Sequence, residues 1–258
     1  MAELTYRDAV ARGIAQEMAR DPDVIFFGED VAKAGGVFKT TVGLYEQFGG
    51  KRVRDCPISE QAILGAAMGA AMTGLKVVAP STPRDVIGLL AAAVRDPDPV
   101  IFFEHKSLYP SKGEVPDGEI VDRLGTAKIV HPGKDATVLA LALMVPRALE
   151  AAERLKAEHR IDCEVIDVRS LVPLDTQTIL GSVGRTHRLF TVEENPRLCG
   201  WGAEIVSIVA DEGFYDLDGP PVRITTPHIP LPAADILEDI ALPTVDRIVD
   251  RVRQSMQG

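Results

Sequence analysis

The chain has few cysteines and few basic residues, and these shortages exclude several classes of protein. Only three cysteines occur among its 258 residues, and no two of them form a CxxC pair. A zinc site is therefore not expected, and reduced thiols fit a cytoplasmic protein. Lys and Arg number 28 against 38 Asp and Glu, which gives a net charge of −10. No nucleic-acid partner is expected, because such a surface needs clustered Lys and Arg.

Long hydrophobic segments are also missing. The apolar stretch at 61–75 is short and rich in Gly and Ala, so no membrane span is expected. Residues 1–8 carry charge from the start and have no apolar core, which argues against a signal peptide. The sequence therefore predicts a cytoplasmic protein that makes no membrane contact.

Familiar catalytic motifs do not occur either. There is no Gly-x-Ser-x-Gly nucleophile motif, and the five histidines have no metal-ligand spacing. The Gly35-Gly36 pair lacks the spacing and the Lys-Ser/Thr of a phosphate-binding loop, so we interpret it as part of a surface loop. His105 follows an apolar run, a position favoured for sites in parallel sheets, but a solvated histidine is the alternative.

Short apolar runs alternate with amphipathic stretches along the whole chain. Continuous runs such as 24–27 and 100–104 are typical of strands buried in a parallel sheet. The pattern predicts an α/β protein with two parallel-sheet domains, at 1–105 and 125–258. Residues 106–124 contain prolines, glycines and scattered charges and are interpreted as a linker. Further strands are expected at 52–56, 76–80, 136–144, 163–168, 188–193 and 222–226, and helices at 5–20, 58–73, 81–95, 146–159, 175–184, 201–212 and 243–256.

One segment carries a candidate catalytic acid. Residues 57–63 (PISEQAI) place Glu60 in the first turn of a predicted helix, directly after the strand at 52–56. Ser59 is a good N-cap, and an acid in the first turn suits the helix dipole, so the helix start alone explains Glu60. The alternative is a proton-transfer role at an interface, because the small residues that follow allow another backbone to come close.

Other acidic residues have two interpretations each. Asp96 and Asp98 flank a tight turn, which they would stabilise, but their oxygens and the nearby carbonyls could also hold a hard cation. Glu29 and Asp30 follow one buried strand, and Glu193 ends another, so each could face a site or serve a structural role. No complete active site emerges, which suggests that a partner supplies the rest.

Several segments, in order along the chain, resemble the β subunit of thiamine-diphosphate-dependent 2-oxoacid dehydrogenases. They are 24–31 (VIFFGEDV), 35–39 (GGVFK), 52–60 (RVRDCPISE), 65–75 (GAAMGAAMTGL), 76–83 (KVVAPSTP) and 163–171 (CEVIDVRSL). That family includes the pyruvate, branched-chain oxoacid and acetoin dehydrogenases and belongs to the transketolase-like superfamily. The resemblance implies a pyrimidine-binding domain followed by a transketolase C-terminal-like domain.

The resemblance also implies a reaction and its partners. Two β subunits assemble with two α subunits, and the α subunit holds most of the thiamine diphosphate and its Mg²⁺. The acid of the family's Ile-Ser-Glu motif falls on Glu60. Its hydrogen bond to the aminopyrimidine favours the imino tautomer, which takes the proton from the thiazolium carbon. The implied activity is oxidative decarboxylation of pyruvate or a branched-chain 2-oxoacid, with acyl transfer to lipoyl groups.

The resemblance implies two more binding sites, and the chain departs from the family at one internal position. The resemblance implies a potassium ion held by Ala93, Val94, Asp96 and Asp98, and contact of Asp218 with the dihydrolipoyl acyltransferase core. In the family, a block with two strands and two helices separates the equivalents of Leu75 and Lys76, which are adjacent here. Because that block carries residues of the cofactor pocket and a catalytic histidine, we expect impaired turnover. The alternative is a non-catalytic assembly subunit that keeps the C-terminal domain.

Overall fold

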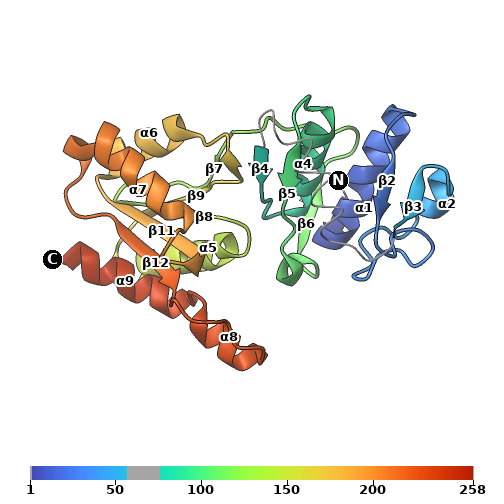
Figure 1. Cartoon of the computed structure of the whole chain (residues 1–258). Coiled ribbons are helices and arrows are strands. Elements are labelled where there is room, and N and C mark those ends of the chain that lie inside the picture. Colours follow the sequence, from blue (N-terminus) through green and yellow to red (C-terminus); the bar gives the residue numbers. More distant parts are fainter. Residues whose placement is uncertain (1, 57–75, 258) are drawn as a thin grey trace. The chain divides into compact units, whose positions relative to one another are not determined.

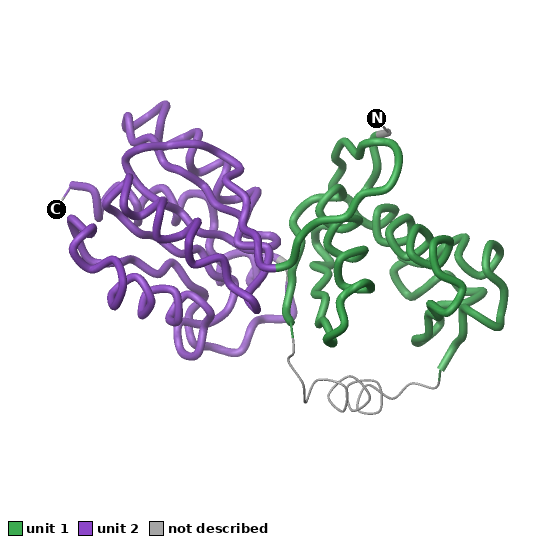
Figure 2. The backbone as a smooth tube through the Cα atoms, turned by 90° about the horizontal axis from the view of Figure 1, so that it is seen from above, with its two compact units in different colours: residues 1–124 green, residues 125–258 purple. Residues whose placement is uncertain are grey.

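The computed structural model describes residues 2–56 and 76–257, so Glu60 lies outside the described residues. The chain divides into two compact units, residues 1–124 and 125–258 (Figure 2). Both contain parallel strand pairs and helices, which confirms the predicted α/β class.

Two packed helices organise the first unit (Figure 1). Helix α1 (Tyr6–Arg20) begins where the Thr5 hydroxyl accepts a hydrogen bond from the amide of Asp8. Helix α4 (Pro83–Arg95) begins at Thr82 in the same way, with proline at its first position. The helices approach closely at Gly13, where a Cβ would lie only 2.9 Å from the Leu90 side chain. Glycine at this position allows the contact.

The described strands of the first unit pair with one another two by two. Parallel pairs join β2 (Phe26–Gly28) to β3 (Val53–Asp55) and β4 (Lys76–Val78) to β5 (Val100–Phe102). The short helix α2 (Leu44–Phe48) precedes β3. Strand β1 (Ala2–Thr5) pairs antiparallel with β6 (Lys112–Val115), which follows the 3-10 turn η2 (Lys106–Leu108). The structure therefore differs from the linker predicted at 106–124, because β6 is paired and its Val115 is buried.

A five-stranded sheet in the order β12-β11-β8-β9-β7 forms the centre of the second unit. Its strands are β7 (Lys128–His131), β8 (Ala136–Ala140), β9 (Cys163–Asp167), β11 (Leu189–Pro196) and β12 (Val222–Thr226), and the short β10 (Ser170–Val172) follows β9. Four strands run parallel and overlap the predicted positions, but β8 ends four residues before the predicted end at 144, and β7 adds an antiparallel edge. The sequence did not predict β7, because four residues with two half-exposed side chains give little periodic signal.

Helices cover both faces of this sheet (Figure 1). The covering helices are α5 (Met144–Arg154) with its π-helical continuation η3 (Leu155–His159), α6 (Thr176–Thr186), α7 (Trp201–Glu212) and α9 (Val245–Gln257). The unit also contains the 3-10 turn η4 (Phe214–Asp216) and the short helix α8 (Asp235–Ala241). Val138 of β8 packs with α5 and α9, and its neighbour Leu139 packs with α6 and α7. Burial on both faces explains the continuous apolar runs of these strands. Within the described ranges, no helix combines the length and apolar character that crossing a membrane requires.

Candidate functional site

The predicted catalytic acid follows a strand whose geometry is described. In the parallel pair, Gly28 of β2 lies opposite Asp55 of β3, and the amide of Cys56 donates to the carbonyl of Gly28 at 2.9 Å. Ligand sites in α/β proteins commonly lie at the carboxyl ends of parallel strands. Residues 57–60 continue the chain from this edge, although Glu60 itself is outside the described residues.

The loop after β2 closes on itself. Asp55 accepts a hydrogen bond from the amide of Ala32 at 2.8 Å. The amide of Gly35 donates to Ala32 at 3.1 Å, and the amide of Gly36 donates to Asp30 at 2.8 Å. Both glycines have positive φ angles. Because their amides already have partners within the loop, they do not form a phosphate cradle. The two glycines are buried, whereas Lys33 and Val37 on either side are exposed, so only part of the loop lies at the surface.

The turn with the predicted potassium ligands is held by a lysine. The Lys76 ammonium lies 2.5 Å from an Asp96 carboxylate oxygen and 3.2 Å from one of Asp98. The hydrogen bond from Lys76 holds the pKa of Asp96 below its usual value. Ala93 and Val94 lie in the last turn of α4, where helix carbonyls lack intrahelical partners. The turn thus brings two carboxylates together around a protein cation, and Lys76 neutralises part of their charge.

An acid–phenol pair, Glu104 and Tyr109, follows β5. The Tyr109 hydroxyl donates a hydrogen bond of 3.0 Å to Glu104. Burial raises the pKa of Glu104, and it also raises the pKa of Tyr109. His105, between them in sequence, accepts a hydrogen bond from the amide of Ser107 at 3.2 Å and begins η2. A local turn therefore accounts for His105. No cluster of three or more His, Cys, Asp or Glu side chains able to hold a metal occurs in the described parts of the chain.

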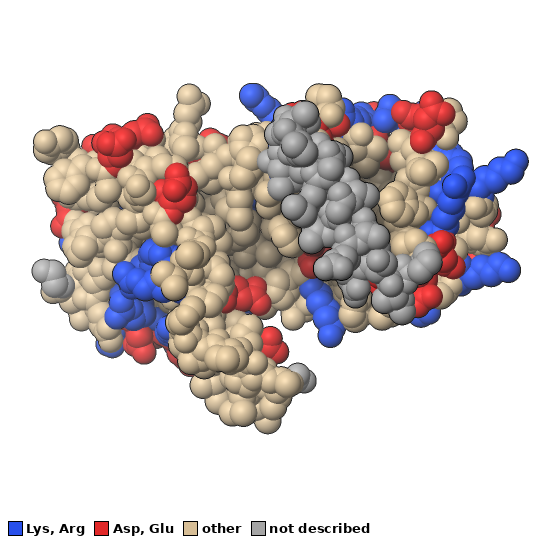
Figure 3. All heavy atoms as spheres, viewed as in Figure 1, with Lys and Arg blue, Asp and Glu red and all other residues tan. Residues whose placement is uncertain are grey.

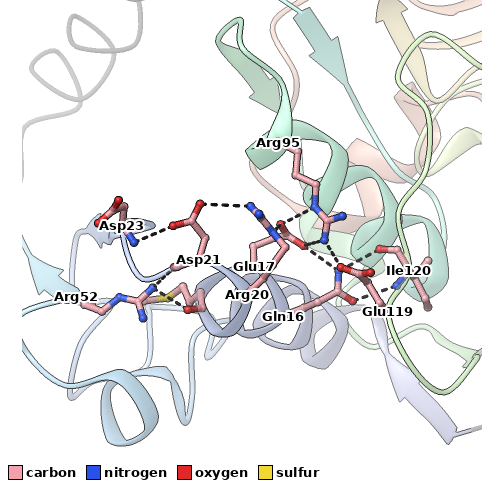
Figure 4. A network of polar contacts seen from close by, with 10 residues as sticks. Gln16, Glu17, Arg20, Asp21, Asp23, Arg52, Arg95, Glu119 and Ile120 are labelled. Atoms are coloured by element: carbon pink, nitrogen blue, oxygen red, sulfur yellow. Dashed lines mark hydrogen bonds and ion pairs between the residues drawn. The ribbon is translucent and has the colours of Figure 1, made fainter.

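Helix α1 contains a fully buried acid, Glu17, that was not among the predicted site residues. Both carboxylate oxygens of Glu17 bind the Arg95 guanidinium, at 2.8 and 2.9 Å, and Arg20 and Gln16 donate further hydrogen bonds at 2.8 and 3.0 Å (Figure 4). Arg95 also binds Glu119, which ties α1 and α4 to the segment before residue 120. The apolar spacing of Val10, Ile14 and Met18 places Glu17 near the core face of α1, which is the signal that could have revealed it.

We expect Glu17 to make stability depend on pH. Burial opposes its ionisation, but hydrogen bonds from Arg95, Gln16 and Arg20 lower its pKa from 4.5 to about 2. A lowered pKa stabilises the folded state above pH 4.5, and this contribution disappears as the pH falls through about 2. The difference corresponds to roughly 3 kcal/mol. Hydrogen exchange of α1 amides should show this loss between pH 5 and 2 in the unmodified protein.

The same measurement on two variants isolates the cause. Glu17→Gln should lose much less stability over this pH range than the unmodified protein, since it has no carboxylate to protonate. Glu46→Gln, which changes an exposed acid on α2, should behave like the unmodified protein. Equal pH dependence in Glu17→Gln and the unmodified protein would contradict the assignment.

Glu193 has a structural role at the end of β11. The Arg223 guanidinium binds both of its oxygens at 2.7 and 2.6 Å, and the amide of Gly202 at the start of α7 donates at 3.0 Å. Thr191 and Asn195 complete its hydrogen bonds at 2.7 and 3.0 Å. Burial opposes ionisation, but these donors lower the pKa of Glu193. Five hydrogen bonds from four residues occupy both carboxylate oxygens, so a structural role accounts for this acid.

Asp218 lies at the end of the five-stranded sheet opposite to Glu193. It is exposed, and its amide donates to the carbonyl of His187 at 2.9 Å. It borders an open cavity of about 710 Å³, whose other lining residues include Lys134, Arg160 and Arg188. These residues precede strands β8, β9 and β11, so the cavity lies at the amino ends of parallel strands. An exposed, mixed-charge surface away from the carboxyl edge suits protein contact better than catalysis.

Two domain families together match nearly the whole chain. The pyrimidine-binding domain of transketolase matches residues 2–79 and 71–112, and the transketolase C-terminal domain matches residues 125–248. The protein is therefore a transketolase-type protein built from these two domains.

Curated relatives define the family more narrowly. The β subunit of acetoin:2,6-dichlorophenolindophenol oxidoreductase from Cupriavidus necator is 35% identical over 334 positions, which cover 99% of this chain and 98% of the relative. The β subunit of 2-oxoisovalerate dehydrogenase from Bacillus subtilis is 34% identical over 324 positions, covering 98% and 99%. The chain belongs to the family of E1 β subunits of the pyruvate, acetoin and branched-chain 2-oxoacid dehydrogenases.

The comparisons also locate the predicted internal gap. An alignment of 334 positions is longer than the 258-residue chain, so the relative has residues where this chain has none. The two pyrimidine-domain matches meet at residues 71–79, which include the junction of Leu75 and Lys76. A solved structure of a split-gene transketolase, described as an inactive β4 tetramer, shares the fold with a TM-score of 0.80 at 19% identity, covering 98% of this chain and 99% of that one.

Proposed function

We propose that this chain is the β subunit of a thiamine-diphosphate-dependent 2-oxoacid dehydrogenase, with pyruvate or a branched-chain 2-oxoacid as substrate. It would assemble with an α subunit, a second β subunit and a dihydrolipoyl acyltransferase core, and acyl groups would pass to lipoyl groups of that core. The observation that carries the proposal is family membership over both domains. The parallel edge of β2 and β3, from which residues 57–60 continue, supports it.

The role proposed for Glu60 is to orient and activate the cofactor. Thiamine diphosphate, when bound with Mg²⁺ held mostly by the α subunit, supplies the carbon nucleophile that attacks a 2-oxoacid. Glu60 would hold a proton between its carboxylate and the aminopyrimidine, at the edge where the parallel strands β2 and β3 end. Exclusion of water at a subunit interface would strengthen this hydrogen bond.

Reconstitution tests the function. The chain is mixed with the α subunit of the same organism, thiamine diphosphate, Mg²⁺ and a 2-oxoacid, and reduction of 2,6-dichlorophenolindophenol is followed. Turnover that requires both chains and the cofactor supports the proposal. Failure of the chain to associate with the α subunit contradicts it.

A second candidate is a non-catalytic assembly subunit. The internal gap falls in the pyrimidine-binding domain, whereas the five-stranded sheet of the second unit is covered on both faces. A chain whose gap is confined to the pyrimidine-binding domain can keep the assembly surfaces of its second unit even when its catalytic activity is impaired. Stable association with the α subunit without turnover would favour this function over the first.

For the potassium ion, we propose ligation by the carbonyls of Ala93 and Val94 and by oxygens of Asp96 and Asp98. Because Lys76 binds both carboxylates, the backbone oxygens of the turn carry most of this role. Bound K⁺ at one hundred times its Kd would stabilise the first unit by about 2.7 kcal/mol. Thermal unfolding in KCl and in choline chloride of equal ionic strength tests this, and equal midpoints would contradict it.

The proposed second β subunit would contact helix α8. Ile236, Leu237 and Ile240 of this helix are 77%, 54% and 69% exposed, and Figure 3 shows largely uncharged atoms over α8. Ile236 and Ile240 are four residues apart and so lie on one face of the helix. An exposed apolar helix face of this kind is typical of a protein interface. We therefore assign the face of α8 to contact between β subunits.

We expect Ile236→Asp/Ile240→Asp to weaken self-association of the chain. Buried apolar anchors at an interface can contribute about 2 kcal/mol or more each, so the dissociation constant should rise roughly 100-fold or more. Sedimentation equilibrium measures the change. Tyr215→Asp is the matched control, because Tyr215 is 99% exposed on η4. The assignment fails if the control variant and the α8 variant associate equally.

A further inference from the structure

The first unit contains an apolar cavity that neither proposed function uses. Its volume is about 300 Å³, and its floor includes Ile14 of α1 and Leu90 of α4. Ile25 and Phe26 form one wall, and Phe102 with Glu104 forms another. Residues of α1, α4, β2 and β5 therefore all border the cavity.

The two strands beside this cavity are both edge strands. In the described part of the chain, β2 pairs with β3 only and β5 pairs with β4 only, and β2 and β5 belong to separate sheets. An edge strand presents a row of backbone N–H and C=O groups that another strand can pair with. Neighbouring strands of a sheet lie about 4.8 Å apart, so hydrogen-bonded β2 and β5 would leave no cavity between them.

The relatives differ from this chain beside β4, the strand that pairs with β5. They have residues at internal positions where this chain has none, and the break falls at 71–79, directly at β4. The strand pairs on both sides of the break are nevertheless intact. When a sheet loses internal strands but keeps its outer strand pairs, two kinds of group become exposed. They are the backbone groups at the edges of those pairs and the apolar side chains that the lost strands would cover. Ile25 is 49% exposed and Phe27 is 51% exposed at this edge.

We propose that the cavity between β2 and β5 is a docking slot for an extended apolar strand of another, full-length β-type chain. The incoming strand pairs with the free edges of β2 and β5, and its inward side chains contact Ile14 and Leu90. Addition of a strand to an exposed sheet edge gives affinity through the backbone and specificity through alternate side chains. This inference goes beyond the proposed function, because it concerns completion of the sheet by a second polypeptide and not the reaction.

Labelled peptides test the slot directly. Overlapping 15-residue peptides cover the part of the B. subtilis 2-oxoisovalerate dehydrogenase β subunit that has no aligned residues in this chain. Fluorescence anisotropy with the full chain should show one peptide binding saturably, with a Kd of roughly 10 μM. The same peptide with a central proline should bind at least about tenfold more weakly, because proline removes a backbone donor. Hydrogen exchange should slow at the amides of β2 and β5 when the peptide is bound.

Two matched variants complete the test. Ile25→Glu places a charge in the wall of the cavity and should weaken binding at least about tenfold. Val37→Glu makes the same change at a side chain that is 68% exposed and outside the cavity, and should leave binding unchanged. The proposal is overturned if no peptide saturates below about 1 mM, if protection appears away from β2 and β5, or if both variants bind like the unmodified protein.

Discussion

Replacing Arg223 with methionine is expected to lower the free energy of unfolding of residues 125–258 by about 3–5 kcal/mol. Glu193 is completely buried, and the Arg223 side chain is 8% exposed. Methionine retains much of the apolar stem but leaves the carboxylate without its cation in a low-dielectric interior. The remaining donors, Thr191, Asn195 and Gly202, cannot neutralise a full negative charge.

The chain provides its own probe for this measurement. Its single tryptophan, Trp201, begins α7 and is adjacent to Gly202, whose amide binds Glu193. Urea unfolding followed by Trp201 fluorescence therefore reports the second unit. Arg251→Met, at an exposed position of α9, is the control and should change stability by less than about 0.5 kcal/mol. In the double variant Glu193→Gln/Arg223→Met, part of the loss should be recovered, because no buried charge remains.

A loss below about 1 kcal/mol in Arg223→Met would mean that water or a shift of the protein solvates Glu193 in the absence of arginine. The structural assignment of Glu193 would then fail, and a functional role at this carboxyl edge would have to be reconsidered.

The elements with strong local signals were predictable from the sequence. Helices α1 and α4 have Thr caps and amphipathic spacing, and β8, β9 and β11 are apolar runs covered on both faces. These features depend only on nearby residues. The predicted helix starts at Thr5 and near Thr82 and the parallel pairing of the strands were therefore confirmed.

Features that depend on distant partners were not predictable in this way. Strand β6 is paired with β1, more than one hundred residues away in the chain, and its own sequence, Lys-Gly-Glu-Val, has little strand character. The ion pairs of Glu17 with Arg95 and of Glu193 with Arg223 join residues 78 and 30 positions apart. Composition and periodicity carry no information on such pairs. The role proposed for Glu60 comes from the family motif, since a helix start alone explains its local sequence.

In the reconstituted enzyme, Glu60→Gln is expected to reduce the turnover number by about 10²–10⁴-fold. Glutamine can accept a hydrogen bond, but it cannot share a proton with the aminopyrimidine as a carboxyl group can. Association with the α subunit should be unchanged, because the substitution removes a charge without altering the side-chain length. Dye reduction gives the turnover number, and analytical ultracentrifugation checks the assembly.

Two comparisons separate this role from a merely structural one. Glu60→Asp keeps the acid but moves it back by one methylene, so it should retain more activity than Glu60→Gln. Glu46→Gln, the same change at an exposed acid of the first unit, should be as active as the unmodified chain. Calorimetric titration with thiamine diphosphate adds a readout that does not depend on turnover, and weaker cofactor binding by Glu60→Gln is the expected result. If Glu60→Gln binds the cofactor and turns over like the unmodified chain, proton transfer does not pass through this carboxylate, and activation of the cofactor must come from the α subunit alone.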